Sequence, residues 1–249
     1  MANEDFIFGR NSVTEALNAG RSVNKLFLLD DKNNPSLKKI FAQAKEKKIV
    51  VEFLSRAKLD KLSGGKNHQG VIASVAPVKY ATLEEILQFA EEKNQPPFLI
   101  LLDELEDTHN FGAILRTADA VGVHGVIIPK RRSVSINSTV AKTSSGAVEY
   151  VKVTQVTNVA ETLKKLRDLD LKIVGSDIDG EKNFSDADLT GGIVLVVGSE
   201  GKGMRRLTKE NCDLLVKIPM VGKINSLNAS VAGAVLMYEI FNQRSKVNR

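Results

Sequence analysis

Residues 192–230 bring together glycines, a carboxylate, amides and hydroxyls at spacings that suit binding a ligand and acting on it. An apolar run over 193–197 stops at residues 198–203, which read GSEGKG. Three glycines in six residues exclude a helix interior, and they let the backbone take positive φ angles and approach a ligand closely. Glu200 lies among these glycines, so the loop carries a carboxylate that could anchor an amide or a cation.

Two further segments place polar groups near the ends of apolar runs. A second run over 214–218 ends at Pro219, and residues 226–230, which read SLNAS, open an apolar helix that we expect over 226–243. In open α/β sheets, ligands bind beyond the carboxyl ends of the strands. The two strand ends and the helix start therefore predict one binding site. A plain structural turn is the alternative interpretation of a lone glycine-rich loop.

Two familiar nucleotide-binding motifs do not fit this loop. A P-loop requires G-x-x-x-x-G-K-[ST], but Gly201-Lys202 is followed by Gly203, and Val196 stands where the first glycine would be. The dinucleotide fingerprint G-x-G-x-x-G also fails, because the glycines here follow the order G-x-x-G-x-G. These mismatches weigh against the two corresponding classes of nucleotide-dependent enzyme.

Strand and helix patterns alternate along the chain, which is typical of a layered α/β fold. Before residue 80, we expect strands over 25–29, 49–53 and 71–75 and helices over 36–48 and 55–62. After residue 97, we expect strands over 98–102, 125–129, 151–153, 172–176, 193–197 and 214–218, with helices over 137–146 and 157–169. Another helix follows the strand over 98–102, and Asn110 fits its N-cap.

The chain is expected to hold two domains. Residues 1–79 form a small α/β domain, residues 80–97 a linker or surface helix, and residues 98–249 a larger α/β domain. Residues 1–79 hold 14 Lys and Arg against 8 Asp and Glu, while residues 98–249 hold 20 against 18. The basic surplus of the first domain predicts a polyanionic partner there, with a solvated basic face as the alternative.

The composition limits the cellular location and the kinds of bonded site that this chain can have. The 249 residues are 43% hydrophobic and 26% charged, with a net charge of +5. No apolar run approaches the ~20 residues of a membrane span, and the acidic start lacks signal-peptide features, so we expect a cytoplasmic protein with no membrane partner. Cys212 is the only cysteine, which excludes an internal disulfide, and the histidines offer no metal-ligand spacing.

The adjacent cations Lys130, Arg131 and Arg132 suggest phosphate contacts, with a solvated loop as the alternative.

Three motifs resemble those of the SpoU (TrmH) family of RNA 2′-O-ribose methyltransferases. They are residues 110–118 (NFGAILRTA), 197–204 (VGSEGKGM), and 218–220 (IPM) with 226–230, in the family's order and spacing. Residues 9–13 (GRNSV) and 68–71 (HQGV) resemble the substrate-binding domain of the subgroup that methylates a guanosine ribose in 23S ribosomal RNA. The chain departs from the family at Thr108, where proline is frequent.

The resemblance implies a fold, a cofactor and an assembly. The implied C-terminal α/β domain contains a deep trefoil knot that binds S-adenosylmethionine, and the implied enzyme is a homodimer that methylates ribosomal RNA. By matching positions, the catalytic set is Asn110, Arg116, Glu200, Ser226 and Asn228, and the cofactor-binding set is Gly198, Gly201, Ile218, Leu227 and Asn228. We assign RNA contacts to Arg10, Lys130, Arg131 and Arg132, and we expect no metal ion.

Arg116 raises a chemical question, because the ribose hydroxyl must lose a proton and arginine is effectively never deprotonated in proteins. We interpret Arg116 as a fixed cation that holds a phosphate and stabilises the developing alkoxide. An exposed salt bridge with Asp119 is the alternative. His109 is a conceivable base, although a surface-loop histidine is the more common outcome for such a residue.

Three functions stay open at this point. The first is RNA 2′-O-methylation, on ribosomal RNA or on tRNA. The second is a non-catalytic RNA-binding assembly protein on the same fold, and the intact residues Asn110, Arg116, Glu200 and Asn228 count against it. The third is another nucleotide-dependent α/β enzyme, which the failed glycine motifs oppose.

Overall fold

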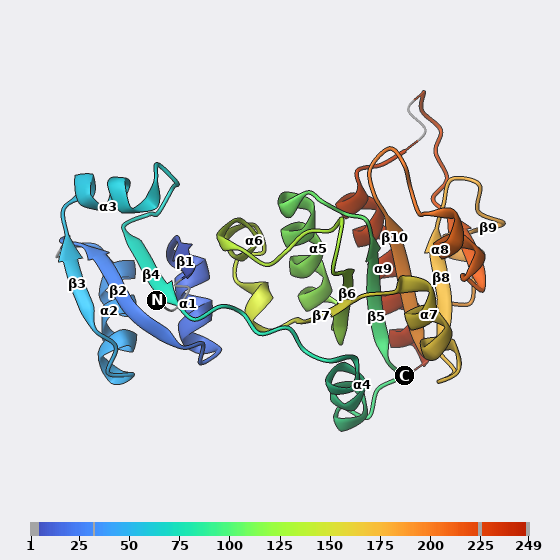
Figure 1. The fold of residues 1–249 in the computed structure, drawn as a ribbon, viewed down its shortest axis with the longest axis horizontal. Helices are drawn as coiled ribbons and strands as arrows, with labels where there is room; N and C mark the ends of the chain where they lie inside the picture. The colour runs from blue at the N-terminus through green and yellow to red at the C-terminus, as the bar shows by residue number, and fades with distance from the viewer. Residues whose placement is uncertain (1–4, 32, 224–225, 248–249) are drawn as a thin grey trace. The chain divides into compact units, whose positions relative to one another are not determined.

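The computed structural model describes residues 5–31, 33–223 and 226–247. The chain divides into two compact units, whose elements are labelled in Figure 1. The first unit comprises Met1–Lys79 and Ile136–Tyr150, and the second comprises Tyr80–Ser135 and Val151–Arg249. Both units are α/β, as the alternation of strand and helix patterns predicts.

The first unit is built on a four-stranded sheet with the order β1-β4-β2-β3. Its strands are β1 (Asp5–Phe8), β2 (Val23–Leu29), β3 (Val51–Leu54) and β4 (Val71–Val75), and its helices include α1 (Arg10–Asn18), α2 (Pro35–Glu46) and α3 (Arg56–Ser63). β2 and β3 run parallel, whereas β4 is antiparallel to β1 and to β2. The strands and helices expected before residue 80 are thereby confirmed.

Residues 136–150 belong to the first unit, although they lie between two strands of the second unit in the sequence. They form α6 (Ser138–Thr143), which contacts β1, and the 3-10 helix η1 (Ala147–Glu149). The single helix expected over 137–146 is therefore too long. Its last residues, Ser145 and Gly146, take φ angles of 54° and 93°, which an α-helix does not accommodate.

The second unit contains a seven-stranded sheet with the order β7-β6-β5-β10-β8-β11-β9, in which every described pair is parallel. Its strands are β5 (Phe98–Asp103), β6 (Gly125–Pro129), β7 (Lys152–Val156), β8 (Lys172–Ser176), β9 (Lys182–Asn183), β10 (Ile193–Gly198) and β11 (Leu214–Lys217). Its helical elements are α4 (Leu83–Glu92), α5 (Thr108–Ala120), α7 (Val159–Arg167), η2 (Phe184–Asp186), α8 (Arg206–Glu210) and α9 (Ala229–Val247). The six strands expected after residue 97 are confirmed, whereas β9 and α8 were not predicted.

Helices cover both faces of this sheet. On one face, Leu99 and Leu101 of β5 pack in a core with Leu163 of α7. On the other face, α5 packs against α9, and α9 lies against β10 (Figure 1). A parallel sheet that is covered on both sides needs apolar residues at successive positions, which explains the continuous apolar sequences of β5 and β10. None of the described helices combines the length and the apolar character needed to cross a membrane.

Helix α4 lies in the segment expected as a linker or surface helix. Thr82 and Glu85 form a capping box that starts the helix. Ile86 and Ala90 are fully buried, and Ile86 covers Gly125, where an added Cβ would lie 2.5 Å from the Ile86 side chain. This helix is therefore part of the second unit's core rather than a spacer.

Lowering the pH should destabilise the second unit through His124, which is 1% exposed. Its Nδ1 accepts a hydrogen bond from the Phe98 N–H (3.0 Å), and its Nε2 donates to Gln95 Oε1 (3.1 Å), so the ring is neutral. Burial, followed by the nearby cations Lys93 and Arg244, lowers the pKa of His124 to about 4. The unfolded chain then binds a proton that the folded chain excludes.

Stability should therefore fall as the pH drops from about 6.5 to about 4, by up to about 3 kcal/mol. Urea unfolding at several pH values checks this for the wild type and for His124→Gln, which has no ring to protonate. The variant should show a flatter pH dependence over that range. Equal slopes for the two proteins would show that His124 is not the group responsible.

Candidate active site

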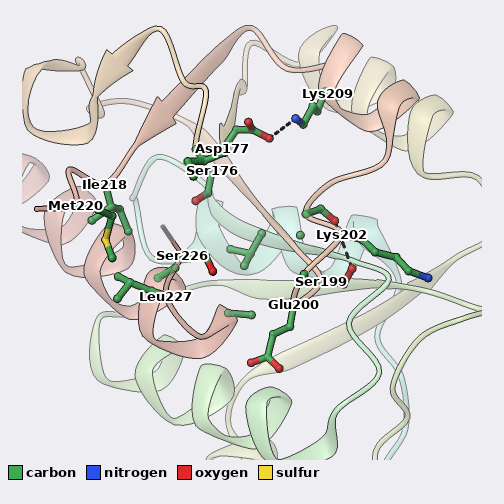
Figure 2. Close-up of a pocket in the computed structure, with 17 residues that line it drawn as sticks. Ser176, Asp177, Ser199, Glu200, Lys202, Lys209, Ile218, Met220, Ser226 and Leu227 are labelled. Atoms are coloured by element: carbon green, nitrogen blue, oxygen red, sulfur yellow. Dashed lines mark hydrogen bonds and ion pairs between the residues drawn. The ribbon is translucent and has the colours of Figure 1, made fainter. Parts of the chain in front are cut away.

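A cavity of 320 Å³ opens at the carboxyl ends of β8, β10 and β11 (Figure 2). Six of the predicted site residues line it: Gly198, Glu200, Gly201, Ile218, Ser226 and Leu227. Figure 2 shows Ile218, Met220 and Leu227 together on one side and Glu200 apart from them. The strand ends and the helix start thus meet at one cavity, at the edge of the sheet where the sequence predicted a binding site.

The glycine-rich loop after β10 closes on itself. The Ser199 N–H donates to the Gly203 carbonyl (3.1 Å), and the Gly203 N–H donates to the Ser199 carbonyl (2.9 Å). A Cβ at Gly198 would lie 2.2 Å from the Gly203 backbone, and Gly201 and Gly203 have φ angles of 77° and 65°. The loop's own closure therefore requires these glycines, and at Gly198 the crowding atoms belong to the loop rather than to the cavity.

Two amides and one carboxylate form a directed hydrogen-bond chain at this cavity. Asn228 immediately precedes α9, and its Oδ1 accepts from the backbone N–H groups of Ser230 (3.0 Å) and Val231 (3.3 Å). Its Nδ2 donates to Asn110 Oδ1 (3.0 Å) and to Glu200 Oε1. Asn110 Nδ2 in turn donates to Glu200 Oε1 (2.9 Å). Because each oxygen faces a donor, both amides are held in one orientation with their nitrogens toward Glu200.

The expectation that Asn110 caps α5 is wrong. The helix begins at Thr108, and the capping side chain is Asp107, whose Oδ1 accepts from the His109 N–H (2.6 Å). Asn110 is the third residue of the helix, so its side chain does not cap the helix. It is 7% exposed and hydrogen-bonds instead with Asn228 and Glu200. His109 is exposed and does not line the cavity.

Arg116 is not part of this hydrogen-bonded group. It is exposed on α5, and its side chain makes no hydrogen bond or ion pair with another residue of the described ranges. The alternative of a surface salt bridge with Asp119 therefore finds no support. An unpaired guanidinium on the helix that carries Asn110 is open to an anionic partner.

The predicted RNA-contacting cations lie in both units. Lys130, Arg131 and Arg132 are all exposed after β6, and Arg132 Nη1 is 4.0 Å from Glu104 Oε1. In the first unit, the Arg10 N–H donates to Gln69 Oε1 (3.0 Å), and Arg10 Nε donates to the Gln69 carbonyl (3.1 Å). Arg10 thus supports the turn at Gln69 through its backbone N–H and its Nε.

An ion pair that was not predicted from the sequence joins the buried Asp103 to the half-exposed Arg205, just after the glycine loop. Asp103 ends β5 beside Gly198, and its side chain is fully buried. Arg205 donates to it from Nε (2.9 Å), from Nη2 (2.6 Å) and from the backbone N–H (2.8 Å). Hydrogen bonding to Asp103 raises the pKa of Arg205 above its usual value. The only sequence signal was a lone carboxylate at the end of an apolar strand.

Arg205→Ala should lower the free energy of unfolding by about 2 kcal/mol, because it leaves the buried Asp103 carboxylate with only the backbone N–H of residue 205 as a donor. Arg206→Ala is the matched control, since Arg206 pairs with Glu210 on the surface with 80% of its side chain exposed. That change should cost less than about 0.5 kcal/mol. Urea unfolding at neutral pH compares the two variants, and equal losses would contradict a structural role for the Asp103–Arg205 pair.

Comparisons with known proteins agree with this architecture. Residues 97–238 match the SpoU rRNA Methylase family, and residues 6–81 match the RNA 2′-O ribose methyltransferase substrate-binding domain. YacO of Bacillus subtilis, named for the TrmH family of tRNA/rRNA methyltransferases, is 46% identical over 98% of this chain and 97% of its own length.

Two solved structures share the fold over nearly the whole chain. The SpoU methyltransferase AviRb from Streptomyces viridochromogenes superposes with a TM-score of 0.82 at 24% identity, covering 98% of this chain and 91% of AviRb. Its complex with the cofactor AdoMet gives a TM-score of 0.81 at 23% identity, with the same coverage of both chains. From the match over residues 97–238 and the identity to YacO, it follows that this chain belongs to the SpoU rRNA Methylase family of RNA methyltransferases.

Proposed function

We propose that this chain transfers a methyl group from S-adenosylmethionine to the 2′-hydroxyl of a ribose, and that its substrate is a guanosine of 23S ribosomal RNA. The observation that carries the proposal is the hydrogen-bonded group of Glu200, Asn110 and Asn228 at the cavity. The AviRb complex with AdoMet supports the cofactor. The resemblance of residues 9–13 and 68–71 to the 23S guanosine subgroup supports the substrate.

The residues around the cavity fit this cofactor. The volume of 320 Å³ lies within the range of about 300–1,000 Å³ that small-molecule sites occupy. Val197, Ile218 and Leu227 offer an apolar wall for an adenine ring, and Glu200 offers negative charge to a cationic ligand. S-adenosylmethionine, when bound, supplies a methyl group activated by its sulfonium. The family resemblance further implies that a trefoil knot surrounds this cavity.

Each of the proposed catalytic residues has a different role. Glu200 keeps the amides of Asn110 and Asn228 in one orientation, so that their polar groups are fixed before the substrate arrives. Ser226 lines the cavity and adds a hydroxyl that both donates and accepts. Arg116 acts as a fixed cation that binds a phosphate and stabilises the negative charge that develops on the ribose oxygen as its proton passes to solvent water.

The proposed assembly is a cytoplasmic homodimer that binds ribosomal RNA. Helix α9 exposes the apolar side chains Val231, Tyr238 and Phe241, which fall on one stripe of the helix. A second subunit covering this stripe would lie close to α5, because α5 packs against α9. The exposed cations Lys130, Arg131 and Arg132, together with Arg10, are the proposed RNA contacts.

Mapping ribose methylation in ribosomal RNA and tRNA from cells with and without the protein tests this function. The proposal expects one 2′-O-methylguanosine of 23S ribosomal RNA to disappear when the protein is absent. Loss of a methyl group from tRNA instead would keep the reaction but contradict the substrate. An unchanged pattern in both RNAs would favour a non-catalytic RNA-binding assembly protein.

A further inference from the structure

Two charged residues that lie outside the three family-like motifs form a pair in the wall of the cavity. Asp177 directly follows β8, and Lys209 lies in α8. Lys209 Nζ is 2.5 Å from Asp177 Oδ2, and Figure 2 shows the two side chains meeting at the cavity. Only 5% of the Asp177 side chain is exposed. A carboxylate is therefore nearly buried in the wall of the cavity.

The described residues of the protein do not use all of the hydrogen-bonding capacity of this pair. Asp177 Oδ1 accepts from the Asp179 N–H (3.1 Å), and Oδ2 accepts from Lys209. An ionised carboxylate offers about four acceptor positions, and an ammonium offers three donors. The pair therefore presents spare acceptors and spare donors side by side at the cavity wall.

The charge of the pair selects the kind of ligand group that fits there. The two side chains together carry no net charge. A ligand group with a carboxylate alone would meet Asp177, and one with an ammonium alone would meet Lys209, so each is repelled by one member. The amino-acid end of the ligand carries both charges, and we place its ammonium near Glu200, which lines the cavity apart from the pair. A pair of neighbouring hydroxyls is neutral, and each hydroxyl both donates and accepts.

We propose that Asp177 and Lys209 form the subsite that recognises the ribose diol of the bound nucleoside cofactor. This inference rests on the proposed function, because it assumes that the cavity binds S-adenosylmethionine. The apolar wall of Ile218 and Leu227 then suits the adenine, and Glu200 lies apart from the diol subsite, on the side suited to the cationic part of the ligand. Asp177 thereby selects for a ribonucleoside ligand.

The test is calorimetric binding of S-adenosylhomocysteine and of its 2′,3′-dideoxy analogue to three proteins: wild type, Asp177→Asn and Asp179→Asn. Asp179 is the matched control, because its exposed side chain does not line the cavity. The wild type should bind S-adenosylhomocysteine at least about 10-fold more tightly than the dideoxy analogue, the scale of hydrogen bonds to charged groups. Asp177→Asn should lose most of this ratio, and Asp179→Asn should keep it.

A ratio of two ligands on one variant is insensitive to a general loss of stability. If Asp177→Asn does not fold, Lys209→Gln probes the subsite from the partly exposed partner and should also lower the ratio. A variant at Asp177 or Lys209 that keeps the full wild-type ratio would overturn the diol subsite and leave the proposed function standing. Failure of the wild type to bind S-adenosylhomocysteine would contradict the proposed function, and this inference with it.

Discussion

Replacing Arg116 with alanine should slow single-turnover methyl transfer by about 100-fold or more, the scale of a lost electrostatic contact in a transition state. Arg116 is exposed and unpaired within the described ranges, so its positive charge is available to the RNA substrate. Cofactor binding should be unchanged, because Arg116 does not line the cavity. Arg116→Lys should recover part of the rate, since a point charge does not reproduce the planar fork of a guanidinium.

The pH dependence of the rate separates two roles for this residue. If Arg116 is a fixed cation, the Lys variant should keep the wild-type profile, because the titrating proton belongs to the substrate. If the residue is instead the base, the Lys variant should add a limb that reports its own lower pKa. Arg206→Ala is the control for loss of an exposed arginine in the same unit. A near-wild-type rate in Arg116→Ala would defeat both roles.

Replacing Leu227 with arginine should weaken cofactor binding by about 100-fold or more, because a charge would face the apolar wall of the cavity without a partner. Leu227 is 38% exposed and lines the cavity, so the fold should tolerate the change. Val221→Arg is the matched control, since Val221 is fully exposed and does not line the cavity.

Calorimetry with S-adenosylmethionine, combined with the melting temperature of each variant, checks this expectation. Val221→Arg should bind like the wild type. A Leu227→Arg protein that melts normally and binds with wild-type affinity would remove Leu227 from the cofactor site.

Strand ends were the best-predicted part of the site. The apolar runs over 193–197 and 214–218 end where β10 and β11 end, to within one residue. Strands that are buried on both faces leave a continuous apolar signal, and glycines mark the point where the chain must turn. These two signals are local, which is why the cavity's location followed from sequence while its detailed contacts did not.

The start of α5 shows where local signals fail. Asp107 and Asn110 are both favoured N-cap residues, three positions apart, and propensity does not choose between them. The structure selects Asp107, because Asn110 is drawn into hydrogen bonds with Glu200 and Asn228 from other parts of the chain. A side chain that seemed to serve the helix thus belongs to the site.

The sequence does not show which distant residues pair with one another. Arg205 meets Asp103 across 102 positions in the chain, and Lys209 meets Asp177 only because α8 lies beside the end of β8. Residues 136–150 likewise pack in the first unit, although in the sequence they lie between β6 and β7 of the second unit. Contacts of this kind depend on topology, which a local pattern does not encode.

Following the methyl group from the cofactor to the RNA tests the proposed reaction. The purified protein is incubated with S-adenosylmethionine carrying a tritiated methyl group and with unmodified 23S ribosomal RNA, and the RNA is then digested to nucleosides and separated. The proposed function predicts that the label is recovered as 2′-O-methylguanosine. Label recovered in a base-methylated nucleoside, or no labelled RNA from a protein that binds the cofactor, would contradict it.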